Sequence, residues 1–135
     1  MKSIKNVRLP AYDYSSIGYY FVTICADQRH PILPALTSTI ENAICTIKDD
    51  GASVDFHVTM PDHIHMIVVL DDSGIRLGEI IRRFKARSSK EAGRRLWQPN
   101  YYEHVIRTEK ALEKIREYIQ NNPQALEIEL EEFYR

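Results

Sequence analysis

The sequence predicts an α+β domain in which helices pack on an antiparallel β-sheet. The chain has 135 residues, of which 44% are hydrophobic and 27% charged, and this is enough apolar material for one core. Short segments rich in β-branched and aromatic residues alternate with longer segments whose apolar residues recur every three or four positions. No internal repeat or low-complexity linker separates them. We therefore expect a single domain over residues 1–135.

The first half of the chain predicts a strand, a helix and a hairpin. Residues 19–25 are β-branched and aromatic, as in a strand. Residues 36–48 place apolar side chains on one helical face, and Asp-Asp-Gly follows. Residues 54–60 and 63–70 are expected to be strands joined by a turn at Pro61-Asp62. In the first of these strands, alternation predicts one face for Val54, Phe56, Val58 and Met60.

The second half predicts a helix, a strand and a final helix. The first helix begins near Leu77 and ends at Gly93, and a short strand covers residues 101–106. Thr108 can cap the final helix, and Pro123 ends it. The first six elements, β-α-β-β-α-β, match the split βαβ, or ferredoxin-like, arrangement, with helices on one face of the sheet. This arrangement serves many functions, so the function has to be inferred from a site.

Composition disfavours several classes of protein. The longest apolar candidate for a membrane span covers only residues 19–26, far short of the length needed. The charged start is not followed by the apolar segment of a secretory signal. Cys25 and Cys45 are too few for a disulfide framework or a zinc cluster, and we interpret them as apolar residues of a protein in the reduced cytoplasm.

Charge is unevenly distributed although the net charge is only −1. Residues 76–95 contain eight basic and two acidic side chains, whereas residues 127–132 contain four glutamates and no basic residue. Such a basic segment can bind a polyanion, or it can simply be the solvated face of a helix. We also consider that the acidic tail could fold over the basic helix and compete with nucleic acid, or remain a solvated end.

A histidine pair is the first candidate for chemistry. His63 and His65 are two residues apart in a predicted strand, so both side chains point to the same face, while Ile64 and its alternate neighbours face the core. Two imidazoles on one face form half of a divalent metal site. The alternative is a pair that occurs by chance and has a structural role.

A tyrosine and an asparagine on the final helix are the second candidate. Tyr118 and Asn122 are one turn apart, on the same side of the helix. A phenol is a usable nucleophile when it is directed at an electrophile that a cation polarises, and an amide oxygen can ligate the metal. Alternatively, Tyr118 flanks the core beside Ile115 and Ile119, and Asn122 caps the helix end.

These residues lie within a set of blocks that resembles a known family. The blocks are Arg8–Ser15, Tyr20–Cys25, Met60–His65, Trp97-Gln98, Tyr101–Arg107 and Glu117–Pro123, in that order. Together they resemble the single-tyrosine transposases with a His-hydrophobic-His motif, and among these the REP-associated tyrosine transposases of bacteria. The blocks extend over most of the chain.

The resemblance implies a catalytic domain that cleaves and rejoins single-stranded DNA near hairpins. It implies that His63 and His65 bind Mg²⁺ or Mn²⁺, with Asn122 as third ligand, although related insertion-sequence proteins often have glutamine there. Tyr118 would form a 5′-phosphotyrosine intermediate. The expected location is the bacterial cytoplasm, at the nucleoid. A monomer and a homodimer both remain open, as does whether Tyr118 serves its own chain.

Basic and aromatic residues then become candidates for DNA contacts. Phosphate contacts are expected from Arg82, Arg83, Lys85, Arg87, Arg94 and Arg95. Base stacking is expected from Trp97, Tyr101 and Tyr102, although ordinary packing of these aromatic side chains is the alternative. Two other functions remain open: a module that binds hairpin DNA or RNA without cutting it, and a metal-binding or interaction protein.

Overall fold

The order of elements expected from the sequence is confirmed. The computed structural model describes residues 18–71 and 73–125, so the Arg8–Ser15 block and the acidic tail at residues 127–132 lie outside the described residues. The strands are β1 (Gly18–Cys25), β2 (Ala52–Thr59), β3 (His63–Leu70) and β4 (Tyr102–Ile106). The helices are α1 (Thr37–Cys45), α2 (Leu77–Ala92) and α3 (Glu109–Asn121). Short 3₁₀ helices are η1 (Asp27–Arg29), η2 (Leu33–Leu36), η3 (Thr46–Asp50) and η4 (Pro123–Ala125).

The four strands form one antiparallel sheet in the order β2-β3-β1-β4. This is the ferredoxin-like strand order expected from the β-α-β-β-α-β pattern. The central strands β1 and β3 pair over their full lengths, from Gly18 opposite Leu70 to Cys25 opposite His63. The central pair is buried on both faces, and β3 therefore consists almost entirely of apolar residues apart from its two histidines.

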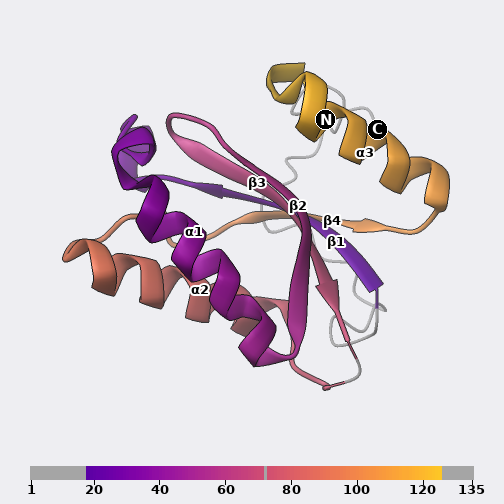
Figure 1. The fold of residues 1–135 in the computed structure, drawn as a ribbon, viewed down its shortest axis with the longest axis horizontal. Helices are drawn as coiled ribbons and strands as arrows, with labels where there is room; N and C mark the ends of the chain where they lie inside the picture. The colour runs from indigo at the N-terminus through magenta and orange to yellow at the C-terminus, as the bar shows by residue number, and fades with distance from the viewer. Residues whose placement is uncertain (1–17, 72, 126–135) are drawn as a thin grey trace.

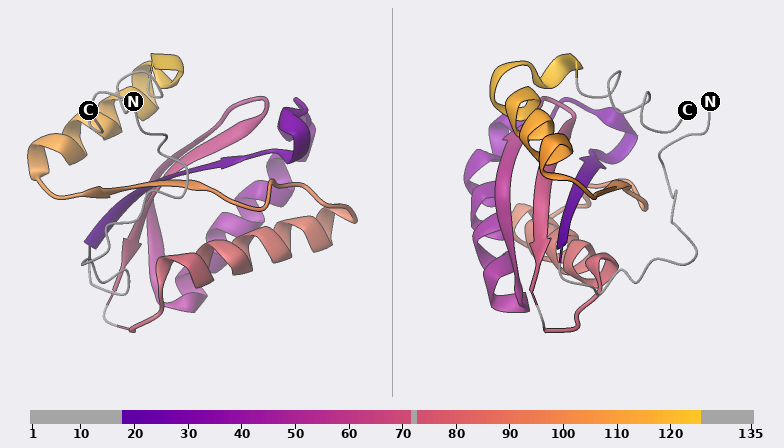
Figure 2. Two further views of the ribbon diagram at one scale, coloured as in Figure 1. Left: turned by 180° about the vertical axis from the view of Figure 1, so that it is seen from behind. Right: turned by 90° about the vertical axis from the view of Figure 1, so that its right-hand side faces the viewer.

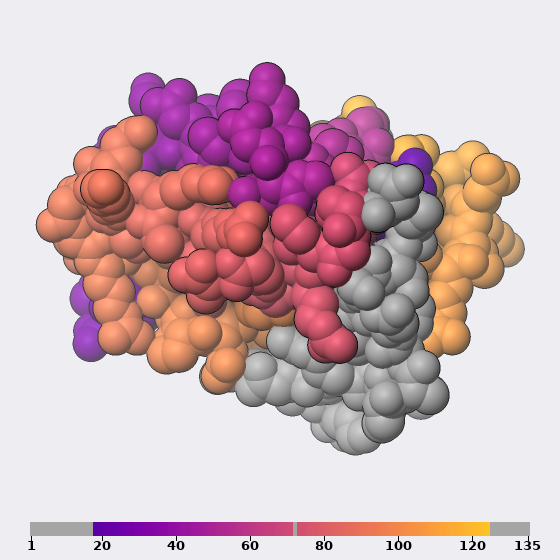
Figure 3. All heavy atoms as spheres, turned by 90° about the horizontal axis from the view of Figure 1, so that it is seen from below, coloured from indigo at the N-terminus to yellow at the C-terminus, as the bar shows by residue number. Residues whose placement is uncertain are grey.

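Helices α1 and α2 cover one face of the sheet, as expected (Figure 1), and they lie side by side at the surface seen in Figure 3. Even-numbered residues of β1 and β3, such as Val22 and Met66, are fully buried beneath them. Helix α2 contributes Leu77, Ile80, Ile81 and Phe84, which are spaced to form one apolar stripe. The helix ends at Gly93, whose φ of 72° is the left-handed geometry that glycine adopts without steric cost.

Helix α3 lies on the opposite face of the sheet (Figures 1 and 2). Its Leu112, Ile115 and Ile119 pack against Phe21 and Ile67, which are odd-numbered residues of β1 and β3. The Thr108 hydroxyl accepts a hydrogen bond from the Ala111 amide at 3.1 Å and so caps the helix, as predicted. The molecule therefore has three layers, and the added C-terminal helix covers the face that α1 and α2 leave open.

A bulge in β2 overturns the expectation that Val54, Phe56 and Val58 share a face. Two residues of β2, at positions 55 and 56, stand opposite one residue of β3. Val54 therefore packs against the core under α1 and α2, whereas Phe56 and Val58 pack against the core under α3. Strict alternation failed here because it assumes one residue per position on both strands.

No helix within residues 18–71 and 73–125 is long and apolar enough to cross a lipid bilayer.

Candidate metal and nucleophile site

The two histidines come together on the sheet face covered by α3. The two Nε2 atoms of His63 and His65 are 3.2 Å apart, and the rings meet edge to face with centroids 4.6 Å apart. His65 is fully buried and stacks on Phe21, a member of the α3 core, at 5.4 Å. The shared face predicted from strand alternation is thus observed.

Each imidazole is held in place by a hydrogen bond at its other nitrogen. The Nδ1 atom of His63 is 2.7 Å from Oδ1 of Asp62, and the Nδ1 atom of His65 is 2.8 Å from Oγ1 of Thr23. A carboxylate only accepts hydrogen bonds, so Nδ1 of His63 carries a proton, and in the neutral ring Nε2 then has a lone pair. The Thr23 hydroxyl can donate or accept, so it tolerates either tautomer of His65.

The electrostatics favour a neutral His65 and an ionised Asp62. Burial is the main reason that the pKa of His65 falls to about 3, and the neighbouring charges of His63 and Arg29 lower it further. Burial alone would raise the pKa of Asp62, but hydrogen bonds from His63 and Arg29 outweigh it and hold this pKa below the usual range. Neutral imidazole is the form that ligates metals.

The geometry fits a divalent cation. Two nitrogens bound to one ion at about 2.1 Å are about 3.0 to 3.4 Å apart for ligand angles between 90° and tetrahedral. The 3.2 Å separation of the two Nε2 atoms lies in this range. Hydrogen bonds at the opposite ring nitrogens are typical of metal-binding histidines, because they fix the tautomer and the ring orientation.

Within the residues that the structure describes, no further histidine, cysteine or carboxylate lies beside the histidine pair as a third metal ligand. Across residues 18–71 and 73–125, no three such side chains are grouped so that they could hold a metal ion. Asn122 carries an amide instead, and it lies at the C-terminal end of α3, where its backbone N–H donates to the carbonyl of Tyr118 at 2.9 Å. Its side chain is exposed.

Tyr118 lies in α3 and packs half-buried against the core on the histidine-bearing face. The Arg116 guanidinium, two residues earlier, anchors this helix to β2 with hydrogen bonds of 2.7 and 3.1 Å to the two carboxylate oxygens of Asp55. The same guanidinium lies over the ring of Phe56, 5.6 Å from its centroid. Asp55 and Phe56 are the bulge residues of β2, and both contact Arg116 of α3. The tyrosine helix is thus docked on the sheet of its own chain.

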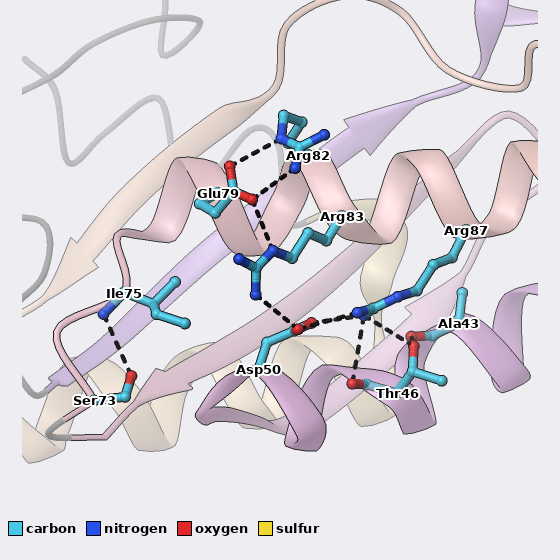
Figure 4. Close-up of polar contacts among 9 residues, drawn as sticks. All are labelled: Ala43, Thr46, Asp50, Ser73, Ile75, Glu79, Arg82, Arg83 and Arg87. Atoms are coloured by element: carbon cyan, nitrogen blue, oxygen red, sulfur yellow. Dashed lines mark hydrogen bonds and ion pairs between the residues drawn. The ribbon is translucent and has the colours of Figure 1, made fainter.

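Arginines of α2 predicted to contact DNA are largely engaged within the protein (Figure 4). Arg87 donates to both carboxylate oxygens of Asp50 at 2.6 and 3.0 Å, and Arg83 donates to Oδ1 at 2.9 Å. Arg82 and Arg83 both donate to Glu79, and these bonds lower the pKa of Glu79 to about 2. Three guanidinium groups therefore share two carboxylates, so much of their positive charge is offset within the protein.

The remaining predicted phosphate contacts are divided between structural and exposed positions. The Lys85 ammonium donates to the carbonyls of Gln98 and Asn100 at 2.8 and 3.0 Å, and burial lowers its pKa to about 8. Arg94 and Arg95 follow α2 and are exposed.

Arg95 belongs to the end of the sheet that carries the histidine pair. Its Nε lies 3.8 Å from Asp27, a residue of η1. Arg29, the last residue of η1, donates to Asp62, and Asp62 in turn contacts His63. The arginines bound to Asp50 lie instead between α2 and η3, on the opposite face of the sheet.

The predicted stacking residues lie at different depths. Trp97 is 3% exposed, and its indole N–H donates to Ser88 at 2.8 Å, so here it is part of the core. Tyr101 is buried, with the Lys85 ammonium 5.8 Å from its ring centroid, and Tyr102 is half-buried. The packing alternative thus describes Trp97 and Tyr101, while Tyr102 has more access to solvent.

Sequence reasoning missed the residues that orient the site. Asp62 was assigned only a turn, and Thr23 only a strand position. The position of Asp62 directly before the His63-Ile64-His65 segment was a usable signal, because carboxylates commonly orient metal-binding histidines. The Arg116–Asp55 pair joins residues 61 positions apart and had no signal in the sequence.

Comparisons with known proteins point to one family. Residues 14–122 match the family model described as IS200-like transposase. An uncharacterized protein of Haemophilus influenzae is 31% identical over 88% of this chain and 87% of its own length. A REP-associated tyrosine transposase of Escherichia coli is 27% identical over 82% of this chain and 68% of its own. A solved structure of a REP-associated tyrosine transposase bound to a REP hairpin superposes with a TM-score of 0.74, at 27% identity, covering 87% of this chain and 72% of that chain.

Proposed function

The chain belongs to the IS200-like transposase family, and from this premise we propose that it cleaves and rejoins single-stranded DNA beside hairpins in a metal-dependent reaction. The observation that supports this most strongly is that α3, which carries Tyr118, packs on the sheet face where His63 and His65 converge. A nucleophile and a metal site on one face are the parts such a reaction needs.

His63, His65 and Asn122 are the residues that would hold Mg²⁺ or Mn²⁺. The histidines supply the two Nε2 atoms and Asn122 an amide oxygen. When bound, the cation would polarise the phosphate and stabilise charge on its oxygens. Asp62 and Thr23 keep the imidazole rings in position for this role.

Tyr118 is the proposed nucleophile. Its phenolic oxygen forms a bond to phosphorus while the bond from phosphorus to the 3′ oxygen breaks. The phenol proton is lost and the departing 3′ oxygen gains one, so the products are a 5′-phosphotyrosine and a free 3′ hydroxyl. The aryl ester retains the energy of the cleaved bond, and a 3′ hydroxyl can attack it to rejoin the strand.

The proposed substrate is single-stranded DNA that carries a hairpin. This rests on the relative whose structure contains a REP hairpin, a hairpin formed by a repetitive extragenic palindrome. Arg94 and Arg95 are the preferred phosphate contacts, because both are exposed and Arg95 lies at the end of the sheet near the histidines. Arg82, with 66% of its side chain exposed, adds charge along α2.

We further propose that Tyr118 works with the histidines of its own chain. The Arg116–Asp55 pair and the apolar residues of α3 dock the helix on its own sheet. Under this proposal, one chain would supply the histidines and the tyrosine of a single site.

A covalent-adduct gel tests the reaction. The protein is incubated with labelled hairpin oligonucleotides that carry single-stranded flanks, in Mn²⁺, Mg²⁺ or EDTA. We expect a slower band that survives denaturation, needs the metal, and is lost in Tyr118→Phe but kept in Tyr102→Phe. Binding without an adduct across a broad panel would instead indicate a module that binds hairpins without cutting them.

Mixing two inactive variants tests the choice of chain. Tyr118→Phe and the His63→Ala/His65→Ala double variant are each expected to form no adduct. Because we assign the histidines and the tyrosine to the same chain, the mixture should also form none. An adduct in the mixture would show that two chains share a site.

A further inference from the structure

We propose that Asp62 and Arg29 are positioning residues that hold His63 in the orientation and tautomer able to bind a cation. The inference rests on the proposed function and deepens it. It concerns two residues outside the predicted set of ligands and nucleophile. The structure connects them in a chain of hydrogen bonds from η1 through the β2–β3 turn to the first residue of β3.

Two hydrogen bonds connect Arg29 to His63 through the carboxylate of Asp62. Arg29 Nε donates to Asp62 Oδ2 at 2.9 Å, and Asp62 Oδ1 accepts from His63 Nδ1 at 2.7 Å. The two oxygens of one carboxylate thus connect a guanidinium to an imidazole. The Arg29 guanidinium also donates to the Cys25 thiol at 3.6 Å, and Cys25 is the partner of His63 in the β1–β3 ladder.

The backbone around this chain of contacts is fixed as well. The Ala26 amide donates to the Asp62 carbonyl at 2.9 Å, so η1 and the β2–β3 turn are joined directly. Within η1, Gln28 and Arg29 have φ of 55° and 56°, and among the described residues these are the non-glycine residues with positive φ. Such geometry is uncommon for residues with a side chain, and it clusters at functional sites. Glycine would adopt it at lower cost, but glycine could not reach Asp62.

The chemical consequence concerns which nitrogen of His63 carries the proton. With Nδ1–H held by the carboxylate, Nε2 keeps its lone pair and faces Nε2 of His65 at 3.2 Å. Without an acceptor at Nδ1, the proton can move to Nε2, and the ring can rotate. Either change removes one of the two nitrogens that a cation needs.

The test compares Asp62→Ala, Asp62→Asn and Arg29→Gln with Glu41→Gln in the full chain. Glu41→Gln is a matched control, because Glu41 forms a carboxylate–histidine contact of 2.9 Å with His57. Mn²⁺ affinity is measured by titration at pH 8. The tautomer of His63 is measured without metal, by long-range ¹H–¹⁵N NMR. Unfolding curves confirm that each variant is folded.

We expect Asp62→Ala to weaken Mn²⁺ binding about 10- to 100-fold, the usual effect of removing such an orienting group. His63 should then shift toward the Nε2–H tautomer. Asp62→Asn should restore part of both, because its amide oxygen can still accept from Nδ1. Arg29→Gln should act in the same direction but less, and Glu41→Gln should change neither quantity.

Unchanged affinity and tautomer in folded Asp62→Ala would overturn the inference, as would an Nε2–H tautomer of His63 in the unmodified protein. If the unmodified protein binds no Mn²⁺, the proposed metal-dependent function fails. The tautomer measurement still decides whether Asp62 controls His63.

Discussion

Replacing Asp50 by asparagine should destabilise the fold by about 2–3 kcal/mol, because the Asp50 carboxylate joins η3 to α2 (Figure 4). Its side chain is 5% exposed and accepts three hydrogen bonds, two from Arg87 and one from Arg83. Asparagine has nearly the same shape, but it lacks the charge and presents an NH₂ group to guanidinium donors.

The magnitude follows from these contacts. A hydrogen bond to a charged group contributes about 1.5–3 kcal/mol, so three such bonds set an upper limit well above the expected loss. The side chains of Arg83 and Arg87 are 35% and 37% exposed, so both can be rehydrated, and Arg83 keeps its bond to Glu79. This reduces the estimate to about 2–3 kcal/mol, or roughly 6–12 °C in Tm for a domain of this size.

Denaturant unfolding measures the effect, with Asp49→Asn as the control. Asp49 is the preceding residue and is exposed, so the same chemical change there should cost less than about 0.5 kcal/mol. Hydrogen bonding by Arg87, followed by that of Arg83, keeps the pKa of Asp50 below its usual value despite burial. The stabilisation is therefore complete above about pH 4 and is lost as the pH falls through the folded-state pKa. Equal stability of the two variants at pH 7 would refute this account of the α2 arginines.

Three further predictions concern other contacts. Burial holds His65 neutral, with a pKa of about 3. The free energy of unfolding, measured in EDTA, should therefore fall as the pH drops below about 6.5, by up to about 1.4 kcal/mol per pH unit. A free energy of unfolding that does not change between pH 6.5 and 4.5 would contradict this prediction. Arg94→Ala should weaken the binding of hairpin DNA and lower the slope of log affinity against log salt concentration by about 1. Arg83→Ala should mainly lower the stability of the fold. The reverse pattern in salt titrations would place the DNA along α2. Arg116→Gln should speed amide hydrogen exchange in α3 relative to β1 and β3, since it breaks the pair with Asp55; unchanged exchange would mean that apolar packing alone docks the helix.

The sequence predicted the helices and strands well, because most of them depend on residues that are close together in the chain. The apolar stripe of α2, the Thr108 cap of α3 and the turn at residues 61–62 each depend on residues close in sequence. Alternation likewise placed His63 and His65 on one face. The bulge in β2 was not predictable, because it depends on how β2 pairs with β3.

The parts of the site that sequence did not predict depend on distant contacts. A segment of basic residues reveals its charge, but it does not reveal which acidic side chains those residues contact. Arg83, for example, binds the buried carboxylate of Asp50, which is 33 positions away in the chain. The sequence also left open which face α3 covers and whether it serves its own chain. The structure answers the first question: the apolar residues of α3 pack on the sheet face opposite α1 and α2, and the Arg116–Asp55 pair adds a contact between residues 61 positions apart.

Mapping the protein–DNA linkage by mass spectrometry tests the central claim most directly. An adduct formed with Mn²⁺ and a hairpin oligonucleotide is digested, and the modified peptide is fragmented to locate the nucleotide. We predict a 5′-phosphate joined to Tyr118 and no adduct when His63 and His65 are both alanine. Linkage to another of the chain's eight tyrosines, or an adduct that forms without the histidines, would contradict the site described above.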